Sequence, residues 1–257
     1  MELGVSTLFC LSRPLEGAME ELKRLGIRYV EVTDDGAHAL NPRRVGLLRE
    51  SRESYGWRFS VHAPFSEVNI AAHDDSLRGA ALRRLETSIK YASEIGAEVW
   101  VFHPGASTAL ERFYPGSSWE RNLESVRHLW RIAEDFGVKA AIENVPEPFP
   151  FLLKSVEDFE RFYSELDGEL GMALDVAHAH IRGETKEFLE RMGERIVHVH
   201  VSDNRGDRDS HLQVGLGTVR WPEVMEGLRR IGFSGAIIIE SYNGIKESLS
   251  LLRRLMG

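Results

Sequence analysis

The amino-acid sequence predicts an α/β protein that folds as a single (β/α)8 barrel over residues 1–257. Three observations support this prediction. Short runs rich in Val and Ile alternate with longer amphipathic stretches along the whole chain, which is the pattern of strand–helix units around a parallel sheet. Eight such units are present, and about 250 residues is the usual length of an eightfold barrel. No linker, low-complexity segment or shift in composition divides the chain into two domains.

The expected strands are short β-branched runs, from LGVST near the N-terminus to GAIIIES near the C-terminus. The seventh run, RIVHVHVSD, begins with strict strand-like alternation and passes into a loop punctuated by glycines. Stretches such as PLEGAMEELKRLG and WERNLESVRHLWRIAEDFG have helical spacing of their apolar residues. In order, the strands are expected at residues 3–7, 29–33, 58–63, 98–104, 139–145, 170–176, 195–203 and 235–241. Helices are expected at residues 14–26, 76–96, 119–137, 155–166, 221–232 and 245–256, and a further helix is expected to end at Gly56.

The composition is that of a globular protein, with 42% hydrophobic and 28% charged residues. The net charge of −8 disfavours a protein that wraps a long stretch of nucleic acid, since that affinity comes mainly from Lys and Arg on phosphates. The N-terminus has no basic leader with an apolar run, and no later segment is apolar enough to span a bilayer. We therefore expect a soluble cytoplasmic protein without a membrane partner. The single cysteine, Cys10, is expected to be a buried strand residue.

Six consecutive expected strands end in a side chain that can bind a divalent metal. In a barrel of this kind, functional groups lie at the C-terminal ends of the strands and in the loops that follow. Carboxylates buried together without a cation would cost several kcal/mol through unpaired charge. The pattern therefore predicts a metal site at the mouth of the barrel. Its expected ligands are His62, His103, Glu143, Asp175, His200 and Glu240.

Three further groups lie close to these positions in the sequence. His178 follows Asp175 by three residues, and Asp209 and His211 lie in the loop after the seventh strand. The glycines at 215 and 217 predict that this loop folds back over the mouth, so that both side chains reach inward. His198 shares a face with His200 but lies one layer deeper, and we expect it to support the ligands. His38, His73, His128 and His180 are expected to be surface or loop histidines.

With these residues assembled, the chain resembles the xylose isomerase-like TIM barrel superfamily. The resemblance covers nearly the whole chain. Within the superfamily, the chain is most similar to the sugar phosphate isomerase/epimerase-like group, which is related to AP endonuclease family 2, the endonuclease IV family of abasic-site nucleases. The motifs that carry the resemblance are VHAPFSEVNIAA, VFHPG, AIENV, LDVAHAH and HVHVSDN followed by DSHLQVGLG.

In the epimerase branch, the resemblance implies one divalent ion held by Glu143, Asp175, His200 and Glu240. The two glutamates are then the catalytic residues. One takes a proton from the carbon beside the carbonyl, and the other returns it after a metal-stabilised ene-diolate. His178 would contact a substrate hydroxyl. This reading predicts a metal-dependent isomerase or epimerase of a small sugar, polyol or sugar phosphate.

In the endonuclease IV branch, the resemblance implies three zinc ions. Glu143 would bridge an ion bound by His62 and His103 to a second one bound by Asp175, His200 and Glu240. His178, Asp209 and His211 would hold the third. The alternative function is therefore an abasic-site DNA endonuclease, and only under it is DNA the partner. Short loops after most strands leave little room for the insertions that this family uses to enter the minor groove.

The chain departs from both patterns in the loop GLGTVR, where the family has GEG before an acidic turn. Arg205 or Arg220 would instead meet a substrate phosphate. We expect one to three ions of Zn, Mn, Co or Mg. The aromatic residues Phe113, Tyr114 and Trp119 would cover substrate, contact a partner subunit of a homo-oligomer, or pack where the helix begins.

Overall fold

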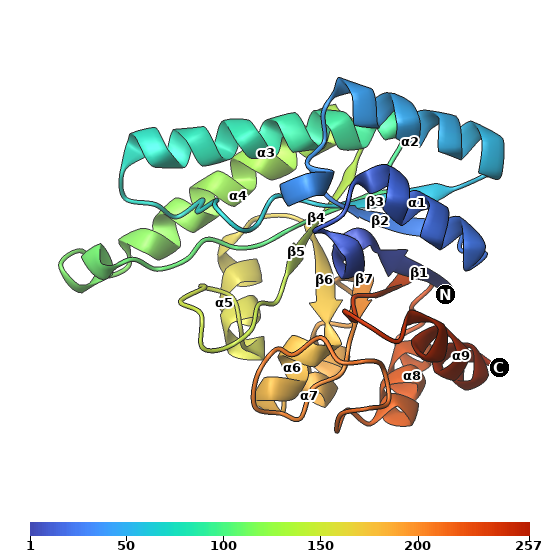
Figure 1. Ribbon diagram of the computed structural model, residues 1–257. Coiled ribbons are helices and arrows are strands. Elements are labelled where there is room, and N and C mark those ends of the chain that lie inside the picture. Colours follow the sequence, from blue (N-terminus) through green and yellow to red (C-terminus); the bar gives the residue numbers. More distant parts are fainter.

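The computed structural model describes all 257 residues, and its eight strands close into one parallel barrel (Figure 1). Neighbouring strands pair in chain order, and the first strand pairs with the eighth. This confirms the predicted (β/α)8 TIM barrel. Most strand ends differ by one or two residues from the predicted ranges. The strands are β1 (Glu2–Ser6), β2 (Tyr29–Thr33), β3 (Arg58–His62), β4 (Val99–Phe102), β5 (Lys139–Glu143), β6 (Gly171–Asp175), β7 (Ile196–Val201) and β8 (Ala236–Ile239).

Nine α-helices surround the barrel (Figure 1). α2 ends at Gly56, which has a left-handed conformation, as expected from the sequence. Two helices, α6 and α7, were not among the expected ones, because seven residues each are too few to show an apolar period. The helices are α1 (Leu15–Arg24), α2 (Pro42–Tyr55), α3 (Asp75–Ile95), α4 (Ser117–Asp135), α5 (Val156–Glu165), α6 (Val176–Arg182), α7 (Thr185–Arg191), α8 (Trp221–Arg230) and α9 (Ile245–Met256).

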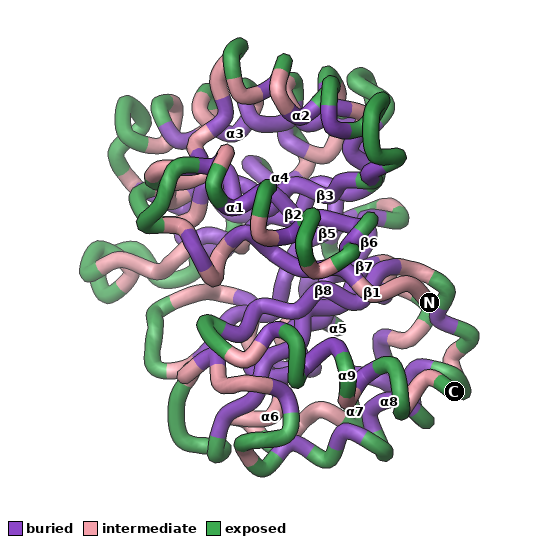
Figure 2. The backbone as a smooth tube through the Cα atoms, turned by 45° about the vertical axis from the view of Figure 1, so that its right-hand side comes forward, coloured by how far each residue is buried: buried purple, intermediate pink, exposed green.

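The core lies between the strands and the inner sides of the helices, and Figure 2 shows the exposed residues on the outer side of the helical layer. Strands of a parallel barrel are buried on both faces. Phe59 and Trp100 are fully buried, and the Trp100 indole donates a hydrogen bond to Ser88 of α3 at 3.0 Å. Burial of these side chains fixes the strands, and so the positions at which they end.

Two sequence expectations are corrected by the fold. Cys10 is buried, but it ends a short 3-10 helix, Thr7–Cys10, because the chain turns at the end of β1. His38 is fully buried in the 3-10 turn Gly36–His38, where its Nε2 lies 2.9 Å from the carbonyl oxygen of Arg13. It is therefore a core histidine. The short polar loop around it resembles a surface loop in sequence, and only the packing of its neighbours buries it.

The loop after β4 separates the three aromatic residues singled out in the sequence. Trp119, in the first turn of α4, is buried, and its indole donates a hydrogen bond to Glu165 at 2.7 Å. Phe113 and Tyr114 are exposed. Homo-oligomer formation and a cytoplasmic location stay predictions. None of the helices combines the length and the apolarity that crossing a membrane requires.

Candidate metal centre

The C-terminal ends of the strands open into one cavity of about 350 Å³. Its walls combine two kinds of side chain. One side carries histidines and carboxylates, and the rest is dominated by apolar and aromatic groups. No lysine or arginine lines it. The lining residues are Leu8, Thr33, His62, Phe65, Ser66, His103, Glu143, Pro146, Phe149, Phe151, His178, Asp209, His211, Glu240 and Tyr242.

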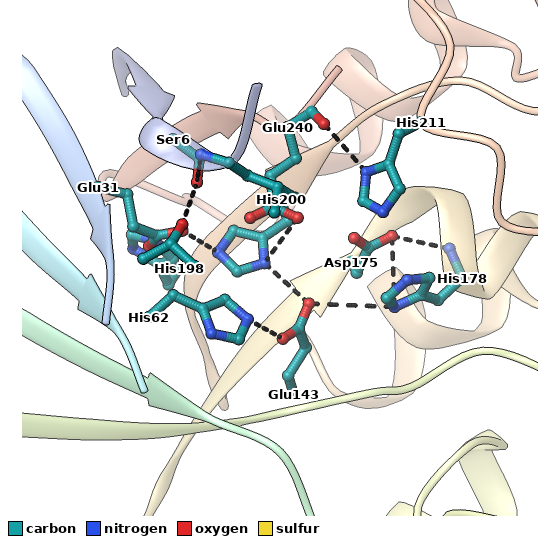
Figure 3. Close-up of polar contacts among 12 residues, drawn as sticks. Ser6, Glu31, His62, Glu143, Asp175, His178, His198, His200, His211 and Glu240 are labelled. Atoms are coloured by element: carbon teal, nitrogen blue, oxygen red, sulfur yellow. Dashed lines mark hydrogen bonds and ion pairs between the residues drawn. The ribbon is translucent and has the colours of Figure 1, made fainter. Parts of the chain in front are cut away.

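Four potential ligands meet beside this cavity (Figure 3): Glu143 and Glu240 line it, and Asp175 and His200 are fully buried behind them. Glu143, Asp175, His200 and Glu240 come from the ends of β5, β6, β7 and β8, and each offers one ligand atom within 4.8 Å of the others. The strand register places Asp175 directly beside His200. Nδ1 of His200 lies 2.8 Å from Oε1 of Glu143 and 3.7 Å from Oε2 of Glu240. The sequence prediction that these strand ends aim at one point agrees with this geometry.

Burial of these carboxylates makes their charge costly. Burial raises the pKa of Glu240 to about 7, against the opposing effect of His200, and it also raises the pKa of Asp175. For Glu143, burial also acts to raise the pKa, but His200 and the other histidines in contact lower it well below its usual value. The histidines therefore compensate only part of the negative charge.

The donor set fits a divalent cation. Oδ2 of Asp175 is buried and has no hydrogen-bond partner, and Asp175 belongs to the cluster of four potential ligands. A buried carboxylate oxygen without a partner destabilises the folded protein unless a cation neutralises its charge. One imidazole nitrogen and three carboxylates suit Zn²⁺, Mn²⁺ or Co²⁺. The residues Glu143, Asp175, His200 and Glu240 could therefore hold one ion.

A second group of potential ligands adjoins the first through Glu143. Oε2 of Glu143 lies 3.2 Å from Nε2 of His62 and 3.0 Å from Nε2 of His103. These three side chains also offer ligand atoms within 4.8 Å of one another. The two oxygens of Glu143 thus face different histidines, since Oε1 lies against His200. A bridging position between two ions is compatible with this arrangement.

The remaining three predicted ligands contact one another at the rim of the cavity. Oδ2 of Asp209 lies 3.0 Å from Nε2 of His211 and 3.4 Å from Nε2 of His178. Burial would lower the pKa of His178, but Asp175 and Asp209 raise it to about 10. His211 is the one non-glycine residue with a positive φ, 42°, a conformation that costs about 1–2 kcal/mol. Its Nδ1 lies 3.0 Å from the carbonyl oxygen of Glu240, which holds the ring against the mouth.

Asp203 organises the loop that carries Asp209 and His211. Its carboxylate accepts hydrogen bonds from the backbone N–H groups of Gly215 and Val219, at 2.8 and 3.2 Å, and from the Trp221 indole at 2.8 Å. A Cβ atom at Gly217 would lie 2.2 Å from Oδ1 of Asp203. Only glycine therefore lets the backbone at this position come so close to the Asp203 carboxylate. The expectation that the glycines let this loop fold back over the mouth agrees with the structure.

Sequence reasoning missed Glu31 of β2, which is fully buried below His200. Its Oε2 lies 2.8 Å from Nε2 of His198 and accepts a hydrogen bond from Ser60 at 2.9 Å, while Oε1 lies 3.0 Å from Nε2 of His200. The available signal was an acid in the middle of the apolar run YVEVT, which needs a buried partner. His198 is fully buried and contacts this glutamate, and its role in supporting the ligands stays a prediction.

The two arginines assigned to substrate in the sequence do not reach the cavity. Arg205 and Arg220 are both exposed, and neither lines the mouth. The Arg220 guanidinium pairs instead with Glu223 on the surface, at 3.0 Å. Substrate binding by Arg205 or Arg220 therefore has no support in this geometry.

Comparisons with known proteins agree with the fold and the strand-end motifs. The family model described as xylose isomerase-like TIM barrel matches residues 19–255. An uncharacterized protein of Methanocaldococcus jannaschii is 34% identical over 95% of this chain and 84% of its own length. The D-psicose 3-epimerase of Ruminiclostridium cellulolyticum is 23% identical over 87% of this chain and 77% of that enzyme.

Solved structures with the same fold also match this chain over nearly its whole length. The crystal structure of a D-tagatose 3-epimerase-like protein matches with a TM-score of 0.94 and 32% identity, covering 100% of this chain and 97% of that one. A protein from Thermus thermophilus, solved after soaking with ZnCl2, matches with a TM-score of 0.73 and 28% identity over 99% and 98% of the two chains. The protein described here therefore belongs to the xylose isomerase-like TIM barrel family.

Proposed function

We propose that this protein is a divalent-metal-dependent isomerase or epimerase of a small sugar or polyol. The observation that carries the proposal is the convergence of Glu143, Asp175, His200 and Glu240 within 4.8 Å, at a cavity that Glu143 and Glu240 line. Two glutamates beside one cation are what proton transfer next to a carbonyl requires. The names of the D-psicose 3-epimerase and of the D-tagatose 3-epimerase-like structure support this choice of reaction.

The roles of the residues follow from their positions. A divalent ion bound by the four ligands would polarise the substrate oxygens and acidify the C–H bond between them. One of Glu143 and Glu240 takes the proton from the carbon beside the carbonyl, and the other returns a proton to that carbon or to its neighbour. His178, at the cavity wall with Nε2 turned towards Asp209, binds a substrate hydroxyl.

The cavity walls favour an uncharged substrate over a phosphorylated one. A volume of about 350 Å³ suits a monosaccharide. Phosphate recognition usually relies on Arg or Lys, and neither lines the cavity. Phe65, Phe149, Phe151 and Tyr242 instead provide faces against which the C–H surface of a sugar ring or chain can pack. A free ketose, or a polyol that carries a keto group, is therefore the proposed substrate class.

The test is turnover of a panel of free ketoses in D2O with Mn²⁺, Co²⁺, Mg²⁺ or Zn²⁺ added. The expected result is a new epimer or isomer that carries deuterium at the carbon that exchanges its proton. A protein that is loaded with metal and leaves every sugar unchanged and free of deuterium would contradict the proposal.

A second candidate function is hydrolysis of phosphodiesters, such as those at abasic sites in DNA, with up to three zinc ions. The specific observation in its favour is the additional group His62, His103 and Glu143. The absence of lysine and arginine from the cavity lining and the net charge of −8 disfavour it. Elemental analysis of protein purified without chelator distinguishes the two, because about one ion per chain supports the isomerase and about three zinc ions support the hydrolase. Cleavage of supercoiled abasic DNA without added metal would then decide for the hydrolase.

A further inference from the structure

Glu31 lies beside His200, the one histidine among the four potential ligands of the candidate metal centre (Figure 3). Its carboxylate is fully buried in the barrel interior, on β2 between β1 and β3. The strand register aligns it with Ser6 on one side and Ser60 on the other. A buried carboxylate is costly unless several donors surround it. The three groups that meet Glu31 are Ser60, His198 and His200.

The ring of His200 lies between carboxylates on both of its nitrogens. Nδ1 of His200 faces Glu143 and Glu240, whereas Nε2 lies 3.0 Å from Oε1 of Glu31. A neutral imidazole carries its proton on one nitrogen only. Carboxylates lie beside both nitrogens of His200, and the one hydrogen bond of the ring is at Nδ1, to Oε1 of Glu143 at 2.8 Å. A cation bound at Nδ1 would take the lone pair of that nitrogen, so the ring proton would lie on Nε2, where Oε1 of Glu31 is the neighbouring carboxylate oxygen. The lone pair of Nδ1 is then directed at the other ligands.

We propose that Glu31 is a positioning residue, which fixes the ring and the tautomer of His200 so that Nδ1 is the metal ligand. His198 and Ser60 hold the Glu31 carboxylate in place through its other oxygen, at 2.8 and 2.9 Å. A carboxylate that accepts a hydrogen bond from the ring N–H of a metal-bound histidine commonly raises the affinity for the metal. This inference rests on the proposed metal centre, but it does not depend on the identity of the substrate.

The test compares Glu31→Gln with Asp34→Asn in Zn²⁺ binding. Asp34 is a matched control because it is also a fully buried acid, lies three residues from Glu31, and pairs with Arg84 at 2.6 Å instead of a ligand. Zinc affinity is measured by competition with a chelating dye. We expect Glu31→Gln to weaken zinc binding roughly ten- to hundredfold. Asp34→Asn should lower the melting temperature and leave zinc affinity unchanged.

A spectroscopic measurement on the unaltered protein keeps the inference testable if Glu31→Gln does not fold. In zinc-loaded protein with ¹⁵N-labelled histidine, the spectrum should show His200 with its proton on Nε2. Glu31→Asp, which keeps the charge, should retain this tautomer and recover part of the affinity.

The outcomes separate this inference from the proposed function. If wild-type protein binds no ion, the metal centre is wrong and the inference fails with it. If wild-type protein binds zinc but His200 carries its proton on Nδ1, or if Glu31→Gln binds zinc as tightly as wild type, the role of Glu31 is overturned while the metal centre stands.

Discussion

The carboxylates of Glu143 and Glu240 converge on the same ring nitrogen, since Nδ1 of His200 lies 2.8 Å from one and 3.7 Å from the other. They come from β5 and β8, three strands apart around the barrel. Both carboxylates also line the cavity, so a substrate bound there would lie within reach of each. This relationship is the basis for assigning proton removal and proton return to these two residues.

Replacing either glutamate by its amide should stop turnover. Glu143→Gln and Glu240→Gln each remove a group that accepts a proton and a charged metal ligand, so we expect kcat to fall by about 10²–10⁴. Steady-state kinetics with the active ketose measures the effect. Glu98→Gln is the control, because Glu98 pairs with Arg58 on the surface at the start of β4 and should leave kcat within about twofold. An amide variant with wild-type kcat would refute the assignment.

The rim residues distinguish the two candidate functions. Asp209→Ala combined with His211→Ala removes the contacts at the rim but leaves the four-ligand cluster intact. We expect an isomerase to survive this double change, whereas a three-ion phosphodiesterase would lose its activity. Both activities are measured on the same preparation, together with the ion content. A sugar epimerase that is dead in the double variant would contradict our assignment of these residues.

The absence of lysine and arginine from the cavity predicts discrimination against phosphate esters. We expect kcat/KM for a free ketose to exceed that for its phosphate ester by at least about tenfold, because one charge-assisted hydrogen bond contributes about 1.5–3 kcal/mol. Phe149, at the mouth and 53% exposed, is a site where a cation can be added. Phe149→Arg should raise kcat/KM for the ester, and Phe149→Leu should not. Equal use of both substrates by the wild-type protein would show that the phosphate lies outside this cavity.

Close backbone packing at Gly217 predicts a local loss of stability on substitution. A Cβ atom there would lie 2.1 Å from the carbonyl oxygen of Asn204, so Gly217→Ala should destabilise by about 1–3 kcal/mol and displace the rim loop. Gly17→Ala is the control. Gly17 lies in α1 with no atom within 4 Å of the added Cβ, and alanine should stabilise that helix by about 0.5–1 kcal/mol. Urea denaturation measures both, and equal effects of the two variants would contradict the close approach.

Buried His38 predicts a specific acid sensitivity. Burial lowers its pKa, and its Nδ1 has no hydrogen-bond partner, so a second proton would bring an uncompensated charge into the core. The unfolded chain therefore binds that proton more readily than the folded one. The stability that neutral His38 contributes is therefore fully present above the pKa of histidine in the unfolded chain, about 6.5. It is lost as the pH falls from that value through the lower pKa of His38 in the folded protein. His38→Gln, measured by urea denaturation across this range, should lose less stability on acidification than wild type, and an unchanged loss would show that other groups cause it.

The amino-acid sequence determined the order of the strands, the fold and the chemical type of each strand end. These are local properties. β-branched runs, amphipathic periods and the residue that follows each run can be read without knowing what lies opposite. His62, His103, Glu143, Asp175, His200 and Glu240 were found in this way because a barrel aims all its strand ends at one mouth.

Only the tertiary structure decided which of these side chains share a contact. Glu31 and His198 are 167 residues apart and meet only because the barrel closes, so nothing in the run YVEVT names the partner of its acid. Arg205 and Arg220 are close in sequence to the rim residues, but the loop held by Asp203 directs them outwards. The burial of His38 likewise depends on how the first two strand–helix units pack. Distances between strands, and the burial that sets the cost of each charge, are properties of the closed barrel and not of any single segment.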